Sequence, residues 1–95
     1  MNCRAIRFMG HAVRRMYERG LQRNDIVEVM RQGEVIADYP DDRPYPSRLM
    51  LGFVAGKPVH VVVARDAGTE QCFVVTAYRP DPSVWTDDFR TRRSS

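Results

Sequence analysis

Hydrophobic residues change their spacing near position 33, and this change divides the chain into a helical part and a strand-rich part. Before it, apolar residues recur three and four positions apart, which is the spacing of an amphipathic helix. The pattern predicts a short strand over residues 5–8 and helices over residues 10–19 and 24–32. Gly20 and Gly33 follow the two helical segments and favour their termination there.

After Gly33, valine, leucine and aromatic residues gather in runs that are typical of strands. The two loops that connect the last three runs are short, so these neighbouring strands must be antiparallel. We therefore predict an α+β domain in which two N-terminal helices pack on one face of an antiparallel sheet. The sheet has four strands, or five if the first short strand joins it. The four runs cover residues 34–39, 48–54, 59–65 and 72–78.

The two middle strands are apolar on both faces, which places them at the centre of the sheet and requires cover on its second face. Residues 83–95 form a C-terminal tail that carries Trp85 and Phe89 and is one candidate for this cover. A second copy of the chain, in a homodimer, is the other candidate. We expect residues 1–95 to form a single domain, with the end of the tail flexible.

Composition excludes several classes of protein. Ninety-five residues, of which 43% are hydrophobic and 28% charged, suffice for one small core. No apolar run approaches the roughly 18 residues of a membrane helix, and the N-terminus lacks the apolar segment of a secretory signal. We expect a cytoplasmic protein with no membrane partner. Cys3 and Cys72 allow at most one bridge, and neither lies near a histidine at metal-ligand spacing. We therefore expect neither a disulfide scaffold nor a metal site.

The charged residues are unusual in kind rather than in number. Fifteen basic and twelve acidic residues give a formal net charge of +3, and Lys57 is the only lysine among the fifteen. Arginine suits bidentate phosphate contacts and base stacking. A GC-rich genome would produce the same bias without any function, so the composition is compatible with a polyanionic partner without requiring one.

The first helix separates its side chains into two sectors. The apolar sector, which we expect to face the core, holds Ala12, Val13, Met16 and Tyr17. The opposite sector holds His11, Arg14, Arg15 and Glu18. A histidine can transfer a proton and an arginine can stabilise charge on phosphate, so this cluster fits phosphodiester chemistry. Alternatively, it is a solvated helix face on which Glu18 pairs with an arginine.

His60 lies in an apolar strand, where a turn through Gly56 and Lys57 would place it opposite Phe53. This position favours a buried histidine. Its place near the strand end is also compatible with a site shared with the first helix. Thr76 and Tyr78 lie on one face of the last strand, either at the edge of the core or with a hydroxyl that donates to a phosphate.

Four blocks of sequence resemble a known family. The segment HAVRRMYERG, at residues 11–20, resembles the opening of the bacterial domain of unknown function 4258. Residues 48–52, 58–63 and 75–81, followed by Trp85 and Phe89, resemble its later blocks in order and spacing. The family is similar in arrangement to the RelE-like and BrnT-like toxins, which are grouped with barnase, EndoU and the colicin nucleases.

This resemblance implies a RelE-like fold and a metal-independent endoribonuclease toxin that has a cognate antitoxin and needs no cofactor. His11 and His60 become the candidate acid and base, Arg15 the phosphate clamp, and Tyr78 or Thr76 an orienting group. The ribose 2′-hydroxyl would be the nucleophile, so the substrate would be RNA. The arrangement of the predicted elements adds three candidate contacts to the RNA backbone: Arg14, Arg48 and Lys57.

A second hypothesis belongs to another class. The domain would be a non-catalytic binding or regulatory module that docks another chain through an exposed Trp85 and Phe89 and its arginine-rich end. Loss of an activity in a folded His11→Ala variant would separate the two hypotheses, since a solvated structural histidine should be silent.

Overall fold

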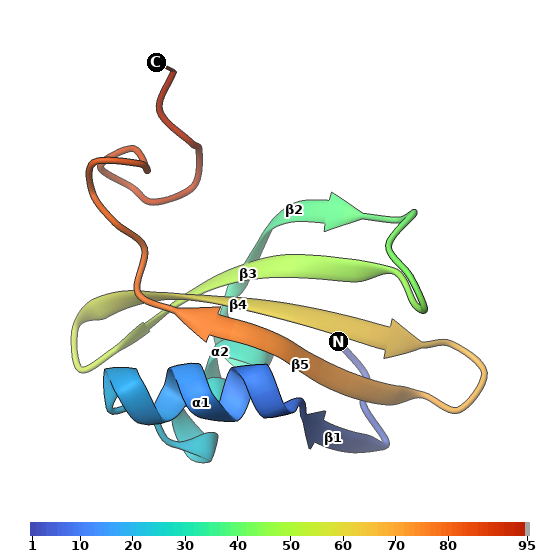
Figure 1. Cartoon of the computed structure of the whole chain (residues 1–95). Coiled ribbons are helices and arrows are strands. Elements are labelled where there is room, and N and C mark those ends of the chain that lie inside the picture. The colour runs from blue at the N-terminus through green and yellow to red at the C-terminus, as the bar shows by residue number, and fades with distance from the viewer. Residues whose placement is uncertain (95) are drawn as a thin grey trace.

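Two helices and a five-stranded sheet make up the domain (Figure 1). The computed structural model describes residues 1–94. The elements, in chain order, are β1 (Ala5–Phe8), α1 (Gly10–Arg19), α2 (Arg23–Gln32), β2 (Glu34–Tyr39), β3 (Ser47–Val54), β4 (Lys57–Asp66) and β5 (Gln71–Tyr78). The predicted α+β class is confirmed, with both helices before the four long strands.

The sheet has the strand order β1-β5-β4-β3-β2. The pairs from β2 to β5 are antiparallel, as their short loops require, whereas β1 joins β5 in parallel. The prediction of a wholly antiparallel sheet is therefore wrong for this pair. The first and last strands are far apart in sequence, so no tight turn fixes their relative direction.

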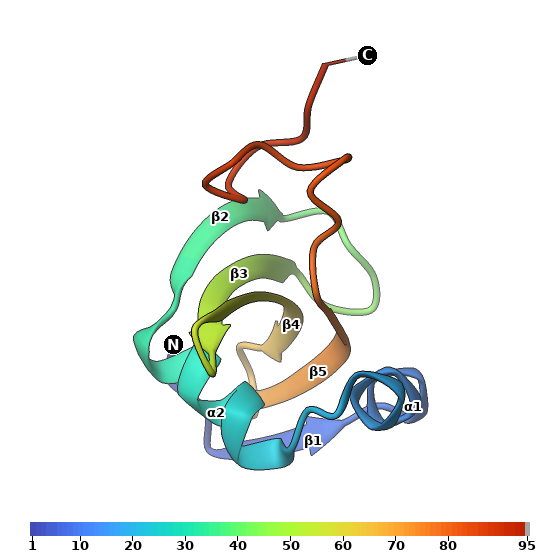
Figure 2. The ribbon, with the colours of Figure 1, turned by 90° about the vertical axis from the view of Figure 1, so that its left-hand side faces the viewer.

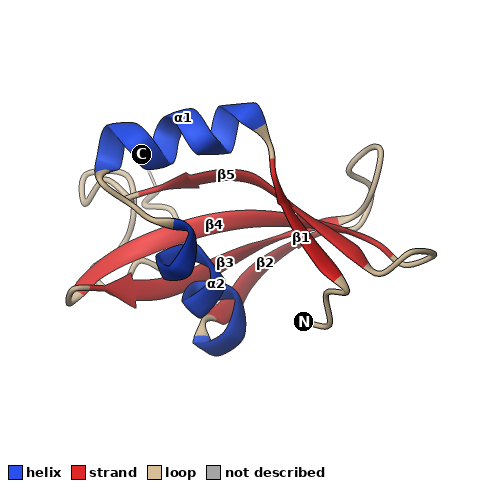
Figure 3. Ribbon diagram, turned by 90° about the horizontal axis from the view of Figure 1, so that it is seen from below, coloured by secondary structure: helices blue, strands red, loops and turns tan. Residues whose placement is uncertain are grey.

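Both helices pack on one face of the sheet (Figure 3). Helix α1 follows β5, while α2 crosses β3 and β4. The α2 contact is close because Gly52 has no side chain: a Cβ there would lie 2.7 Å from a methyl group of Val29. The core beneath the helices consists mainly of Ala12, Met16, Ile26, Val29, Met50, Val59, Val61, Val63 and Val74.

Helix α1 buries a narrower stripe than its periodicity predicts. Ala12 and Met16 are buried, but Val13 is 48% exposed and Tyr17 is 89% exposed. The expectation that Val13 and Tyr17 face the core is wrong. Helix α1 packs along β5 near the sheet edge, so only the residues directly above the strand are covered.

The turn between β3 and β4 fixes the position of His60. Ala55 and Gly56 both have positive φ angles, of 53° and 76°, and Val54 pairs with Lys57. Two central residues with positive φ are the mark of a tight hairpin turn. His60 therefore lies opposite Leu51 and not opposite Phe53, as a turn one residue later would require.

A β-bulge in β5 determines which side chains accompany His60. Val62 pairs with Thr76 and Val63 with Val74, so Val75 is left without a partner on β4. Because of this extra residue, Thr76 and Tyr78 lie on the same face as His60, and Ala77 lies on the helix-covered face. The face that carries His60, Thr76 and Tyr78 is the one opposite the helices.

The C-terminal tail crosses from the end of β5 towards β2 (Figure 2). The ring of Trp85 packs edge-on against His60 with 4.4 Å between ring centroids, and Trp85 is only 9% exposed. The Arg90 guanidinium pairs with both carboxylate oxygens of Glu34 on β2. The tail thus covers His60, and Trp85 is not the exposed docking residue that the binding-module hypothesis assumes.

The N-terminal end is fastened to the sheet by a disulfide between Cys3 and Cys72. We expected no disulfide scaffold, and this single bridge corrects that expectation. Cys72 is fully buried at the start of β5, and Cys3 precedes the strand that pairs with it. The two residues are 69 positions apart, so only the parallel β1–β5 pairing brings them together. Within residues 1–94, neither helix has the length and apolar character to cross a membrane.

Candidate functional site

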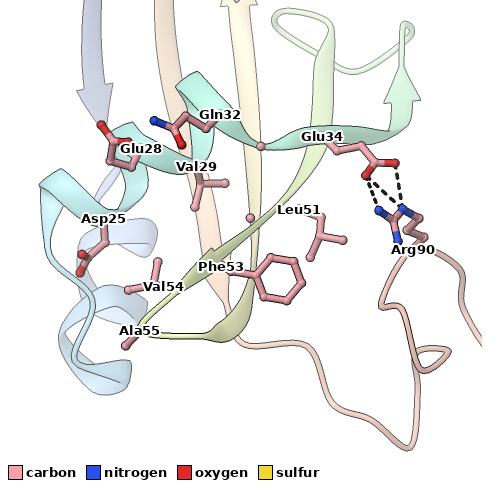
Figure 4. Close-up of a pocket in the computed structure, with 12 residues that line it drawn as sticks. Asp25, Glu28, Val29, Gln32, Glu34, Leu51, Phe53, Val54, Ala55 and Arg90 are labelled. Carbon is pink, nitrogen blue, oxygen red and sulfur yellow. Dashed lines mark hydrogen bonds and ion pairs between the residues drawn. The ribbon is translucent and has the colours of Figure 1, made fainter.

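Several hollows lie on the surface formed by residues 1–94, and their side chains distinguish them. The hollow in Figure 4, of about 510 Å³, lies between α2, β3 and the tail and carries the carboxylates of Asp25, Glu28 and Glu34. The Phe53 ring points into it, and the Glu34–Arg90 pair closes one side. These carboxylates disfavour a polyanion. A second hollow, of about 690 Å³, includes Arg48, which is paired with Asp38 at 2.9 Å.

The third hollow holds most of the groups that could carry out phosphate chemistry. It has a volume of about 420 Å³ and lies between α1, the end of β5 and the beginning of the tail. We call it the α1–β5 groove. It is lined by His11, Arg15, Arg19, Thr76, Tyr78, Arg79, Asp81, Val84 and Trp85. Of the residues predicted for catalysis, the fold therefore brings His11, Arg15, Thr76 and Tyr78 into one groove.

Helix α1 supplies one wall of the groove. His11, Arg15 and Arg19 are four residues apart, so they lie along one face of the helix. Arg15 is 3.5 Å from Glu18, and both side chains are nearly half exposed, so water weakens this pair and Arg15 is available to a phosphate. Neither His11 nor Arg19 takes part in an ion pair among the residues that the structure describes.

Strand β5 and the tail supply the opposite wall. Arg79 follows β5 directly and donates to the Pro58 carbonyl over 3.4 Å. The Asp81 carboxylate accepts hydrogen bonds from the backbone N–H and the hydroxyl of Ser83, and these bonds lower the pKa of Asp81. With Arg15, Arg19 and Arg79 against this single carboxylate, the groove is positively charged at neutral pH.

His60 lies behind this wall rather than in the groove. It is fully buried, so it contacts no solvent and does not face His11 across a common cavity. Its Nδ1 lies 3.2 Å from the hydroxyl oxygen of Tyr78, and its Nε2 lies 2.8 Å from the Phe89 carbonyl oxygen. Burial lowers the pKa of His60 and raises the pKa of Tyr78. His60 is therefore neutral at pH 7, and its hydrogen bond with Tyr78 connects it to the groove.

The three predicted backbone contacts lie outside the groove. Arg14 is exposed on α1, and Lys57 begins β4, directly after the hairpin turn, at the same end of the sheet as Tyr78. Arg48 lies near the opposite end of β3, where it pairs with Asp38. Glu18 contacts Arg15 but does not line the groove.

Sequence reasoning missed Arg19, Arg79 and Asp81, which also line the groove. Arg19 continues the four-residue spacing of His11 and Arg15, a signal that was present in the chain. Arg79 and Asp81 follow the last strand, and only the parallel course of α1 and β5 brings them to the helix.

These features define the class of domain: an α+β fold with a mixed five-stranded sheet and a basic groove between α1 and β5. The model of the Domain of unknown function (DUF4258) family matches residues 8–79, and the chain belongs to this family. Searches of curated proteins and of solved structures gave no match.

Proposed function

We propose that the protein is a metal-independent endoribonuclease that binds the RNA backbone in the α1–β5 groove. The observation that carries this proposal is the convergence of His11, Arg15, Arg19, Arg79 and Tyr78 on one groove. Guanidinium groups bind phosphate through paired hydrogen bonds, and an exposed imidazole can transfer a proton to a bound substrate.

The chemistry follows from the positions of these groups. A general base removes the proton of the ribose 2′-hydroxyl, the 2′-oxygen attacks the adjacent phosphorus, and His11, as the general acid, protonates the leaving 5′-oxygen. Arg15, Arg19 and Arg79 stabilise the charge that develops on the phosphoryl oxygens. The products are a cyclic phosphate and a 5′-hydroxyl. Deoxyribose lacks the 2′-hydroxyl nucleophile, so DNA binds without being cleaved.

The proposal includes a RelE-like relationship and a cognate antitoxin as partner, and both parts rest on the resemblance of the sequence blocks. The non-catalytic binding module is the competing proposal. The binding module was expected to dock its partner through an exposed Trp85, but Trp85 is buried against His60.

Cleavage of mixed-sequence RNA in EDTA tests the proposal. We expect wild type to cleave RNA but not DNA, and His11→Ala to lose about 10²- to 10⁴-fold in rate, as loss of a general acid predicts. Circular dichroism of each variant establishes that it is folded.

Arg14 and Arg15 provide a matched pair of variants on the same helix. Arg15 lines the groove and Arg14 does not, although both are exposed. We expect Arg15→Ala to reduce cleavage about 10²-fold and Arg14→Ala to have a small effect. Equal effects would place the RNA elsewhere on α1. No cleavage by folded wild type would favour the binding module.

A further inference from the structure

The hydrogen bonds of His60 determine which of its nitrogens carries the proton. A carbonyl oxygen can only accept, so Nε2, at 2.8 Å from the Phe89 carbonyl, must donate. A neutral imidazole has one proton, which leaves Nδ1 as an acceptor. The Tyr78 hydroxyl, 3.2 Å away, therefore donates to Nδ1.

This arrangement reverses the role that sequence reasoning gave to Tyr78. We expected its hydroxyl to donate to a phosphate or to orient the substrate. Because the proton of Tyr78 is directed at His60, its oxygen offers only lone pairs to the groove. An oxygen with this orientation can accept a proton from a bound hydroxyl group.

The tail holds the Phe89 carbonyl in place by several contacts. Phe89 has a φ angle of +61°, which residues other than glycine adopt rarely. Its backbone N–H donates to the Thr86 carbonyl over 2.8 Å. The next residue, Arg90, forms the paired contact with Glu34 on β2. The carbonyl that fixes the His60 ring is thus itself fixed from both sides.

Few charged groups influence this pair. Tyr39 on β2 raises the pKa of Tyr78, and Arg92 of the tail, whose guanidinium lies 5.8 Å from the centroid of the Trp85 ring, lowers it. His60 also contacts the Phe89 carbonyl and the rings of Trp85 and Tyr78, none of which carries a charge at neutral pH. Tyr78 contacts His60 and also lines the groove, so a hydrogen bond connects the buried ring to the groove.

We propose that Tyr78 and His60 form a proton relay that acts as the general base of the α1–β5 groove, with His60 as the positioning residue. This inference rests on the proposed function. The 2′-hydroxyl proton passes to the Tyr78 oxygen while the Tyr78 proton passes to Nδ1 of His60. The 2′-oxygen forms its bond to phosphorus, and the bond from phosphorus to the 5′-oxygen breaks as His11 protonates that oxygen. The Phe89 carbonyl stabilises the resulting His60 imidazolium, which returns its proton to water through Tyr78, and His11 regains a proton from water.

The first test needs no RNA. Nitrogen-15 NMR of the full-length protein at neutral pH reports which ring nitrogen of His60 is protonated. We expect a proton on Nε2 and a hydrogen-bonded, unprotonated Nδ1, whose resonance moves to the value of a free acceptor in Tyr78→Phe. A proton on Nδ1, or an Nδ1 resonance that Tyr78→Phe does not move, overturns the relay.

The second test is the pH dependence of RNA cleavage. Tyr78→Phe and His60→Gln should each lower kcat about 10²-fold with KM unchanged and remove the limb of the pH profile that belongs to the base. Tyr17→Phe is the control, since Tyr17 is exposed on α1 outside the groove. If His60→Gln does not fold, Tyr78→Phe alone decides.

The outcomes separate the relay from the proposed function. Cleavage by wild type with an unchanged kcat or pH profile in Tyr78→Phe overturns the relay and leaves the endoribonuclease proposal intact. Absence of cleavage by folded wild type overturns both proposals. In that case the NMR result still shows whether the hydrogen-bonded pair exists.

Discussion

At the scale of single residues, burial dominates the behaviour of His60. Strand alternation predicted a buried histidine, and the structure confirms that His60 is fully buried. For the layer that covers it, the sequence left a choice between the tail and a second copy of the chain, and in the structure Trp85 and Phe89 of the tail contact His60. Sequence patterns give the alternation of a strand, but they do not specify which later segment returns to cover one of its faces.

The lowered pKa of His60 makes the stability of the domain depend on pH. In the unfolded chain the imidazole titrates near about 6.5, and burial places its pKa below that value in the folded chain. Between the two values the unfolded chain binds more protons, so stability falls as the pH decreases below about 6.5 towards the folded pKa.

We therefore expect the free energy of unfolding of wild type to decrease from pH 7 to pH 5, and His60→Gln to show a smaller decrease. Urea denaturation at a series of pH values measures both. Parallel slopes for wild type and His60→Gln would show that His60 does not cause the pH dependence of stability.

At the scale of elements, the strand and helix positions followed from local patterns, whereas the pairing of β1 did not. The segment 5–8 was recognised as a short strand, but its parallel alignment with β5 depends on a contact between the two ends of the fold. Similarly, the periodicity of α1 predicted its polar face correctly but predicted more buried residues than the helix has, since Val13 and Tyr17 are exposed. A helix near the edge of a sheet buries a narrower stripe than one over the centre, and the sequence does not report that position.

The packing of α2 on β3 depends on Gly52. A Cβ at this position would lie 2.7 Å from one methyl group of Val29 and 2.9 Å from the other. We expect Gly52→Ala to destabilise the domain by about 1–3 kcal/mol, because extra volume in a packed core forces neighbouring groups to move. Chemical denaturation measures the change.

A second substitution distinguishes steric crowding from a general intolerance at position 52. Val29→Ala removes the methyl groups in question, so adding it to Gly52→Ala should cost less than Val29→Ala costs in wild type. Gly10→Ala is the control, because no atom lies within 4 Å of a Cβ built there. A fully additive double variant would exclude crowding by Val29.

At the scale of the whole molecule, the net charge of +3 is less informative than its distribution. The hollow of Figure 4 carries several carboxylates, whereas the α1–β5 groove concentrates arginines. Sequence reasoning placed His11 and Arg15 in one site because helical spacing is local information. It placed Arg48 in an RNA interface without knowing that Asp38 on the neighbouring strand pairs with it.

Binding of RNA to this groove should depend strongly on salt. If Arg15, Arg19 and Arg79 each contact a phosphate, counterion release predicts that log K decreases with log salt concentration with a slope of about −2 for single-stranded RNA. Fluorescence anisotropy with a labelled oligonucleotide measures the slope. Removing one of these arginines should make the slope shallower by about 0.7, whereas Arg48→Ala should leave it unchanged. A slope that responds equally to Arg48→Ala would place the RNA over a wider surface.

The two walls of the groove, on α1 and at the end of β5, are synthesised at different times. One wall of the groove comes from residues 11–19 and the other from residues 76–85, so a growing chain has no groove until its last strand and the beginning of the tail have left the ribosome. Contacts between such distant segments form after local helices and hairpins. If the groove is the ribonuclease site proposed above, a nascent chain has no such activity until residues 76–85 have been synthesised and have packed beside α1.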